Sequence, residues 1–260
     1  MPSDFIPGAP GWFDVTSPDI PATAEFYGAL FGWTARDTGP DNDHYTLFLQ
    51  DDALVAGIVT AATPDGGSKP AVWLPYFAVT DCKAAVATAV DAGAGVFIGP
   101  TNAGGAAEFA VLTDPDGAPY CVSQPLSNPG TERFRAVNNP CWVQYAAVRN
   151  PAEAMSHYAK VLGWHYENAA WETAAENPYQ ALTAGGGGGE FGGAALAAPG
   201  QPAPFWSVTF RVADTDATAA RAAELGGTVV QEPQDMPGPS RLGVLADQAG
   251  AAFAIMSVQG

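Results

Sequence analysis

Four stretches of the chain share one order of apolar and polar positions: a short β-rich run, a polar turn, an amphipathic run and a glycine. They begin at residues 12, 76, 142 and 207, and the first reads WFDVTSPDIPATAEFYGALFGW. A polar residue before a helix-periodic run and a glycine directly after it are signs of helix start and stop. The pattern predicts a strand followed by a helix at four places, with Gly32 and Gly93 ending the first two helices.

Short β-rich or alternating runs follow each predicted helix. They read HYTLFL, VAGIV, FAVLTD and PYCVSQ in the first half of the chain, and YQALT, GGAAL, LGVLAD and AFAIMSV in the second. Alternation of apolar and polar residues over a few positions predicts strands. The repeating unit is therefore predicted to be a βαβββ module, present four times.

The spacing of the tryptophans indicates that the four modules form two homologous halves. Six of the seven tryptophans pair at separations of 130, 131 and 133 residues: Trp12 with Trp142, Trp33 with Trp164, and Trp73 with Trp206. We predict an α+β protein of two tandem domains, residues 1–125 and 138–260, joined by a polar linker at 126–137. Each domain is expected to pair two βαβββ modules in a curled mixed sheet with the helices outside.

The composition adds a strong negative charge. Ten Lys and Arg residues against 27 Asp and Glu residues give a net charge of −17. The charge is uneven, with −12 in residues 1–130 and −5 in residues 131–260. Such a field repels nucleic acid and anionic membranes, and it favours cationic ligands or contributes to solubility alone. We expect a small-molecule ligand, no nucleic-acid or membrane partner, and a monomer or homodimer.

Features of cellular targeting are missing from the sequence. No apolar run is long enough to cross a bilayer, and the start MPSDFIPGAPGW lacks the basic and apolar regions of a signal peptide. The three cysteines form neither an even set nor a metal-type spacing. These observations predict a cytoplasmic protein.

Several short motifs occur in the same order in both halves. They are Trp12 to Val15, Phe26-Tyr27, Gly32-Trp33 and TDPDG (113–117) in half one, and Trp142 to Tyr145, His157-Tyr158, Gly163-Trp164 and ADQAG (246–250) in half two. In this order the chain resembles the vicinal oxygen chelate superfamily, which includes glyoxalase I, extradiol dioxygenases and bleomycin-resistance proteins. Tandem two-domain actinobacterial members are the most similar. The resemblance implies the paired-module fold and leaves the activity open, because one fold hosts many chemistries.

The resemblance also implies where a divalent metal ion would be held. The ligand positions of the family fall on Trp12, Leu74 and Cys121 in half one, and on Trp142, Ser207 and Ala254 in half two. A catalytic site needs three N, O or S ligands, so we predict no bound metal and no cofactor. The remaining alternative is an isolated ion held by Asp14, His44 and Glu108.

Aromatic and polar side chains near these positions suggest a ligand site. If Trp12 is at a ligand position, Trp12 and Asp14 share one face of a strand, where an indole and a carboxylate suit a flat cation. We expect clefts lined by Trp12, Asp14, Tyr76 and Tyr120 in half one, and by Trp142, Gln144, Trp206 and Phe253 in half two. Trp73 and Tyr145 complete the predicted ligand-binding set.

The two clefts are expected to differ, with half one preferring cations and half two neutral planar molecules. A run of five glycines, 185–189, is either a mobile flap or a hairpin turn.

Two functions are compatible with these residues. The first is metal-free binding or sequestration of a planar aromatic, neutral or cationic small molecule, in antibiotic resistance or secondary metabolism. The second is an enzyme, either a lyase, an isomerase, or a hydroxylase or cyclase acting on a polyketide-like substrate, with Asp14, Tyr76 and Glu108 as candidate acid–base groups.

Overall fold

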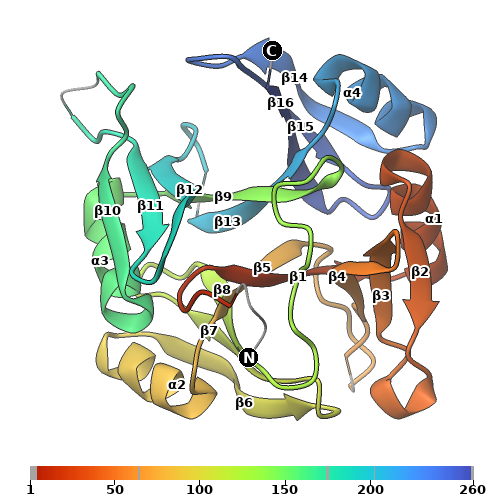
Figure 1. The fold of residues 1–260 in the computed structure, drawn as a ribbon, viewed down its shortest axis with the longest axis horizontal. Coiled ribbons are helices and arrows are strands. Elements are labelled where there is room, and N and C mark those ends of the chain that lie inside the picture. The colour runs from red at the N-terminus through yellow and green to blue at the C-terminus, as the bar shows by residue number, and fades with distance from the viewer. Residues whose placement is uncertain (1–4, 64, 174–175, 202, 259–260) are drawn as a thin grey trace. The chain divides into compact units, whose positions relative to one another are not determined.

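The chain folds into four βαβββ modules in succession (Figure 1). The computed structural model describes residues 5–63, 65–173, 176–201 and 203–258. Over these residues the predicted α+β class, with modules paired in two tandem mixed sheets, is confirmed.

The first two modules form the first sheet. Module one consists of β1 (Pro10–Ser17), α1 (Ile20–Phe31), β2 (Thr34–Asp37), a short 3-10 helix (Pro40–Asn42), β3 (Thr46–Gln50) and β4 (Ala53–Thr60). Module two consists of β5 (Trp73–Ala78), α2 (Cys82–Asp91), β6 (Gly95–Ala103), β7 (Ala107–Thr113) and β8 (Pro119–Pro125).

The last two modules form the second sheet. Module three consists of β9 (Asn139–Ala147), α3 (Pro151–Leu162), β10 (Trp164–Asn168), β11 (Gln180–Ala184) and β12 (Gly187–Leu196). Module four consists of β13 (Phe205–Arg211), α4 (Thr215–Glu224), β14 (Thr228–Asp235), β15 (Ser240–Ala246) and β16 (Ala252–Val258).

Both sheets have the same strand order, as expected for a duplicated domain. The order is β2-β3-β4-β1-β5-β8-β7-β6 in the first sheet and β10-β11-β12-β9-β13-β16-β15-β14 in the second. Within each module the first strand pairs in parallel with the last, and the other pairs are antiparallel. The mixed character of the sheets therefore comes from the βαβββ module itself.

Local sequence sets where the helices begin and end. The Asp19 carboxylate caps α1 by accepting from the Ala22 N–H at 3.0 Å, and Asp81 and Asp214 do the same for α2 and α4. Gly32 ends α1 with φ of 77°, and Gly163 ends α3 with φ of 69°. Because this left-handed conformation is unfavourable for other residues, glycine fixes the helix ends at both repeat positions.

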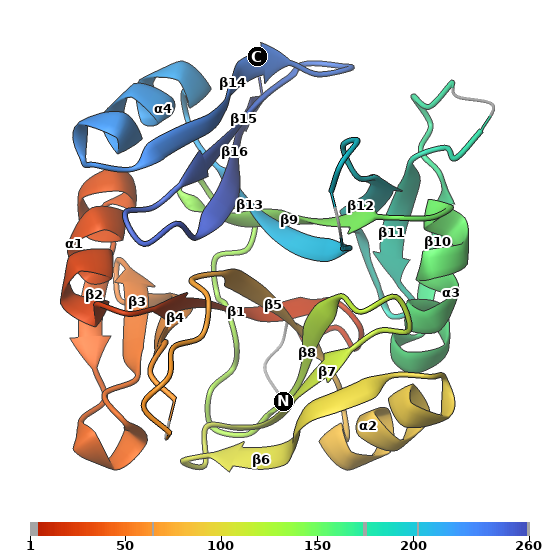
Figure 2. The ribbon, with the colours of Figure 1, turned by 180° about the vertical axis from the view of Figure 1, so that it is seen from behind.

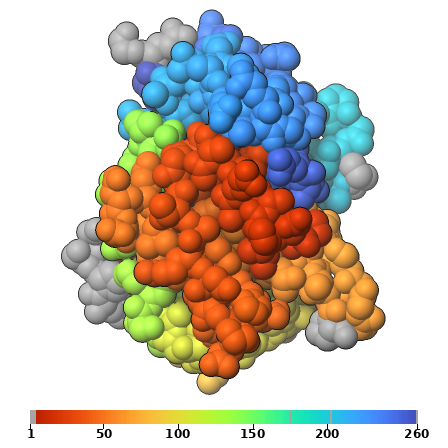
Figure 3. Space-filling model, turned by 90° about the vertical axis from the view of Figure 1, so that its right-hand side faces the viewer, coloured from red at the N-terminus to blue at the C-terminus, as the bar shows by residue number. Residues whose placement is uncertain are grey.

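The contacts between residues divide the chain into two compact units, and these units do not coincide with the two halves of the sequence. Unit 1 combines residues 1–12, 74–130 and 142–207, and unit 2 combines 13–73, 131–141 and 208–260. Unit 1 thus joins modules two and three, with α2 beside α3 (Figures 1 and 2). Unit 2 joins modules one and four, which are in direct contact (orange-red and blue in Figure 3). The boundaries 1–125, 126–137 and 138–260 describe the sequence repeat and stay a prediction.

Each unit has a buried Trp–Tyr–Asp hydrogen-bond chain at its centre. In unit 2, the Trp73 indole donates to the Tyr27 hydroxyl at 2.7 Å, and Tyr27 donates to Asp247 at 3.1 Å. In unit 1, Trp206 donates to Tyr158 at 2.9 Å, and Tyr158 donates to Asp114 at 2.9 Å. In each of these two hydrogen-bond series, the tyrosine belongs to one half of the sequence and the aspartate to the closing turn of the other half. The halves are therefore bonded to one another inside each unit.

Two tryptophans at equivalent repeat positions and the glycine run complete the description of the fold. Trp33 and Trp164 are buried, and their indoles donate to the carbonyls of Asn138 and Gly8 at 2.8 and 2.6 Å. Of the five glycines 185–189, Gly185 and Gly186 form the turn between β11 and β12, and the other three begin β12, where Gly188 faces Ile6. No helix in the described ranges is long and apolar enough to cross a membrane.

Candidate ligand-binding site

The ten predicted ligand residues divide between the two faces of the sheets. Strand side chains alternate, so residues next to one another point to opposite faces. One face packs on α1 to α4, and we call the opposite one the helix-free face. The helix-free face carries Trp12, Asp14, Tyr76, Trp142 and Gln144, whereas the helix side carries Trp73, Tyr120, Tyr145, Trp206 and Phe253.

The prediction that Tyr120, Trp206 and Phe253 line accessible clefts is wrong. Their side chains are buried among aromatic residues of the helix–sheet cores. Each of the three is next to a residue at one of the family's ligand positions, as Tyr120 is to Cys121. Because neighbouring side chains on a strand point to opposite faces, these three point toward the helices.

Trp73 and Tyr145 lie in the same cores. Trp73 is bonded to Tyr27 of α1, and the Tyr145 hydroxyl donates to the buried Asp114 carboxylate at 2.7 Å. Tyr76 is on the helix-free face, where its ring packs edge-on against Phe109 at 6.2 Å. Tyr76 is nevertheless only 8% exposed.

In module one, Asp14 of β1 forms a hydrogen-bonded pair with a residue that sequence reasoning missed. The Tyr45 hydroxyl donates to Asp14 Oδ1 at 2.6 Å. Asp14 pairs across the strands with Gly57 of β4, and a Cβ on Gly57 would collide with the Tyr45 hydroxyl and lie 2.5 Å from Asp14 Oδ1. Glycine at this position therefore leaves the space that the Tyr45 phenol fills. Trp12, two residues before Asp14, lies on the same face of β1. Both side chains are buried, with Trp12 7% and Asp14 5% exposed, so the predicted accessibility of these two residues is not seen either.

Module three repeats this arrangement with an amide in place of the carboxylate. The Tyr179 hydroxyl donates to Gln144 Oε1 at 2.7 Å and accepts from the Trp142 indole N–H at 3.1 Å. Gln144 pairs with Gly193 of β12, and a Cβ on Gly193 would collide with the hydroxyl and ring of Tyr179. Tyr179 thus lies against the sheet at Gly193.

An exposed tryptophan extends this second set toward solvent. The Trp171 ring lies 4.9 Å from the Tyr179 ring at an angle of 48°, and Trp171 is 51% exposed. Trp142, Gln144 and Tyr179 are half-buried. Together these four residues, all in unit 1, form what we call the half-two site.

Burial keeps the Tyr179 phenol neutral. Desolvation raises the pKa of Tyr179 to about 12, with a smaller contribution from the negative charge of Glu190 and an opposing one from the Trp142 hydrogen bond. The hydroxyl therefore keeps its proton at neutral pH and continues to donate to Gln144.

The residues at the family's metal positions do not fit a divalent ion. Indole, leucine, serine and alanine side chains occupy five of the six positions, and Cys121 is fully buried. Within the described part of the chain, no group of three His, Cys, Asp or Glu side chains is arranged to hold a metal. Of the three residues of the alternative ion site, the His44 ring bonds to Asp37, Glu108 lies 3.5 Å from Lys83, and Asp14 accepts from Tyr45.

The thiols are also poor nucleophiles. Burial raises the pKa of Cys82 to about 11 and that of Cys141 to about 12. At neutral pH both side chains are protonated thiols.

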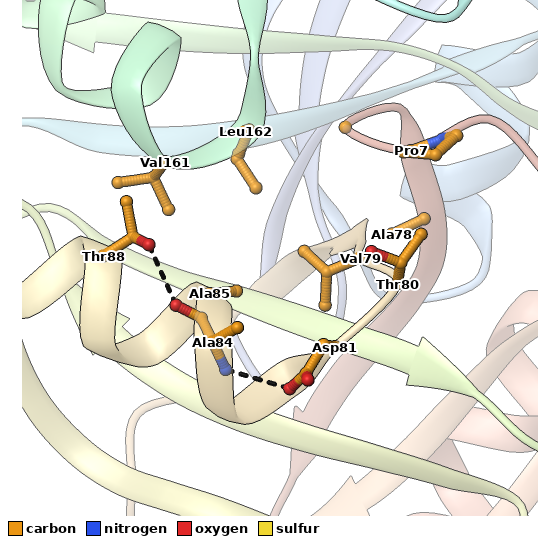
Figure 4. Close-up of a pocket in the computed structure, with 11 residues that line it drawn as sticks. Pro7, Ala78, Val79, Thr80, Asp81, Ala84, Ala85, Thr88, Val161 and Leu162 are labelled. Atoms are coloured by element: carbon orange, nitrogen blue, oxygen red, sulfur yellow. Dashed lines mark hydrogen bonds between the residues drawn. The ribbon is translucent and has the colours of Figure 1, made fainter.

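A separate shallow cavity of about 240 Å³ lies in unit 1 between α2 and α3 (Figure 4). Its lining includes Pro7, Val161 and Leu162 and none of the predicted ligand residues. Its polar side chains serve the helix, since Asp81 caps the Ala84 N–H and the Thr88 hydroxyl donates to the Ala84 carbonyl, both at 2.9 Å. We assign no ligand to this cavity.

The predicted ligand set does not contain Tyr45, Gly57, Tyr179 or Gly193. A signal was present, because Tyr45 and Tyr179 are 134 residues apart and Gly57 and Gly193 are 136 apart. These separations are close to those of the tryptophan pairs. A search of the repeat restricted to polar aromatics and glycines would have found them.

Comparisons with known proteins show which families and relatives the chain is similar to. Residues 12–123 match the family model of the glyoxalase-like domain, and residues 142–255 match that of the Glyoxalase/Bleomycin resistance protein/Dioxygenase superfamily. The chain is 35% identical over 267 residues to the anthracycline biosynthesis protein DnrV of Streptomyces peucetius, covering 98% of this chain and 95% of that protein.

Solved structures show the same fold at low sequence identity. The Mn(II)-bound glyoxalase from Novosphingobium aromaticivorans has a TM-score of 0.66 at 15% identity, covering 97% of this chain and 82% of that chain. The 2,3-dioxygenase LapB from Pseudomonas sp. KL28 has a TM-score of 0.62 at 13% identity, covering 98% and 94%. At these identities the likeness extends to the fold alone.

Proposed function

Because the chain belongs to the glyoxalase/bleomycin resistance protein/dioxygenase superfamily, we propose that it binds a planar aromatic small molecule without a metal ion. The ligand sites are the helix-free faces of β1 and β9. The partner is a small molecule rather than nucleic acid or membrane, and the protein acts in the cytoplasm as a monomer or homodimer. Antibiotic resistance or secondary metabolism is the corresponding role.

One observation carries this proposal: both halves keep an aromatic and hydrogen-bonding set at the position where the family places metal ligands. Trp142, Gln144 and Tyr179 make it up in half two, and Asp14 and Tyr45 are the matching pair in half one. Flat aromatic surfaces stack on planar ligands, and the polar group beside them orients the ligand. A core that needed only packing would not place a carboxylate or an amide here.

The names of the relatives support the ligand class. DnrV and DauV, the latter 34% identical over 268 residues, are both named anthracycline biosynthesis proteins. Anthracyclines are planar fused-ring aromatic compounds, many of which carry an amine. Asp14 and the charge of −12 in residues 1–130 favour the cationic part of such a molecule in half one.

The test is a titration at low salt of purified protein with proflavine, a planar cation for the half-one site, and with fluorenone, a neutral planar molecule for the half-two site. Wild type should bind both, and Trp12→Ala should weaken proflavine binding and Trp142→Ala fluorenone binding by about 1–3 kcal/mol each. The loss of proflavine affinity caused by Asp14→Asn should grow as salt is lowered. Phe97→Ala, which removes a 72% exposed aromatic ring from β6, is the control and should bind as wild type does. Equal affinity of wild type and both tryptophan variants would overturn the proposal.

Elemental analysis of the same preparation tests the metal-free part. A stoichiometric transition metal that survives dialysis, together with activity lost on chelation, would show that the protein is a metalloenzyme.

A second function is favoured by the word biosynthesis in the names of the relatives. The hydrogen-bonded Asp14–Tyr45 pair could move a proton at a polyketide-like substrate, as a hydroxylase, cyclase, lyase or isomerase requires. Glu108, paired with Lys83, and the buried Tyr76 are weaker candidates. Conversion of an aromatic polyketide by wild type that is lost in both Asp14→Asn and Tyr45→Phe, with binding retained, would favour this function.

A further inference from the structure

Resting on the binding function above, we propose that the half-two site selects planar ring systems that carry a carbonyl oxygen, which is bound by the side-chain amide N–H of Gln144. The inference follows from the direction of each hydrogen bond in the site.

The orientation of the Gln144 amide is fixed by a backbone group. Its Nε2 lies 3.1 Å from the carbonyl oxygen of Tyr145. A carbonyl can only accept, so the NH₂ end of the amide must face it. The Oε1 end then faces Tyr179, whose hydroxyl donates to it at 2.7 Å.

The Tyr179 hydroxyl is fully used as a donor. Its one proton goes to Gln144 Oε1, and one of its lone pairs accepts from the Trp142 indole at 3.1 Å. The indole N–H can only donate and the amide oxygen can only accept, so the two partners fix this direction. Donation therefore runs from Trp142 through Tyr179 to Gln144.

The group left to meet a ligand is a donor. The NH₂ of Gln144 has two protons, and the Tyr145 carbonyl uses one of them. Because Gln144 is half-buried and lies beside the Trp142 and Tyr179 rings, the second proton is available to a ring substituent on a stacked ligand. A carbonyl oxygen is the acceptor that planar quinone-like and ketone-containing rings offer.

The matching residue in half one cannot do the same. An Asp14 carboxylate has no N–H and accepts only, so it suits hydroxyl or ammonium groups. Half one thus offers a hydrogen-bond acceptor and half two a donor. This difference exists although Tyr45 and Tyr179 lie in the same way over Gly57 and Gly193.

Fluorenone and fluorene are suitable probes, because these flat three-ring molecules differ only in a carbonyl against a CH₂ group. Their dissociation constants are measured by quenching of tryptophan fluorescence with wild type, Gln144→Glu and Gln144→Met. Glutamate keeps the length and the acceptor for Tyr179 but lacks the N–H, and methionine keeps the volume. We expect the preference for fluorenone over fluorene to fall about fivefold in both variants, the usual effect of one neutral hydrogen bond.

Effects of a substitution on folding or on hydrophobic binding in general change both affinities alike, so they cancel in the ratio of the two. The exposed Gln248→Glu variant adds the same charge outside the site and should keep the wild-type ratio. If both probes bind and the ratio is unchanged by either substitution at Gln144, the carbonyl assignment is overturned and the binding function stands. If neither probe binds to wild type, the proposed binding function of the half-two site fails.

Discussion

His157 shows how one residue type changes the chemistry of a repeat position. Its ring is buried on α3, with Nε2 2.9 Å from the Tyr120 hydroxyl and Nδ1 3.2 Å from the Ala92 carbonyl. The equivalent residues in the other unit are Phe26 and Phe253. Burial lowers the pKa of His157, so between the folded and unfolded values the unfolded chain binds the extra proton. His157 should therefore make the fold less stable as pH falls below about 6.5, the unfolded value.

Urea unfolding at pH 7.5 and 5.5 measures this effect. The double variant His157→Phe, Tyr120→Phe, which copies the apolar residues of the repeat, should lose less stability on acidification than wild type. The single variant His157→Phe should be less stable than the double variant by ~1 kcal/mol, because it leaves the buried Tyr120 hydroxyl without its acceptor. Parallel losses in wild type and the double variant would assign the acid sensitivity to other groups.

At the level of elements, the pairing of β9 with β12 makes the half-two site. The register that places Gln144 opposite Gly193 gives the Tyr179 ring its position, because only a glycine leaves room there. Gly193→Ala should displace the ring, break its bonds to Gln144 and Trp142, and weaken fluorenone binding by ~1 kcal/mol or more. Gly99→Ala, at a β6 glycine with no atom within 4 Å of an added Cβ, should leave binding unchanged.

Circular dichroism spectra of both glycine variants show whether each one is folded, so that loss of the site can be told from loss of the fold. Unaltered binding by a folded Gly193→Ala protein would show that the Tyr179 position is irrelevant to the ligand.

For the whole molecule, the exchanged tyrosine–aspartate bonds predict that a half cannot be a stable folded monomer. Residues 1–130 alone contain Tyr27 and Asp114, but their partners Asp247 and Tyr158 belong to the other half. Leaving such buried groups unpaired costs about 1–3 kcal/mol each. Since Tyr27 and Tyr158 are repeat equivalents, two copies of the half could satisfy each other.

Sedimentation of the purified 1–130 fragment should show a dimer when it is folded, and Tyr27→Phe with Asp114→Asn should shift it toward monomer. A folded monomeric fragment that unfolds cooperatively would contradict the importance of these bonds.

The sequence alone was sufficient for the modules, the repeat and the fold family. Helix caps such as Asp19 and Gly32, strand alternation and tryptophan spacing are local or periodic signals, and each depends on a few neighbouring residues. The family's ligand positions, together with the same alternation, predicted that Trp12 and Asp14 share one face of their strand, and Trp142 and Gln144 one face of theirs.

Only the tertiary structure decided the rest. Tyr120 and Trp206 are buried because α3 of the neighbouring module covers them, and no local pattern records which module lies opposite. The same holds for Tyr179 over Gly193 and for Asp114 bonded to Tyr158, contacts that depend on strand register and on which modules pack together. A repeat predicts that equivalent contacts exist twice, but the exchange of partners between halves is a property of packing in three dimensions.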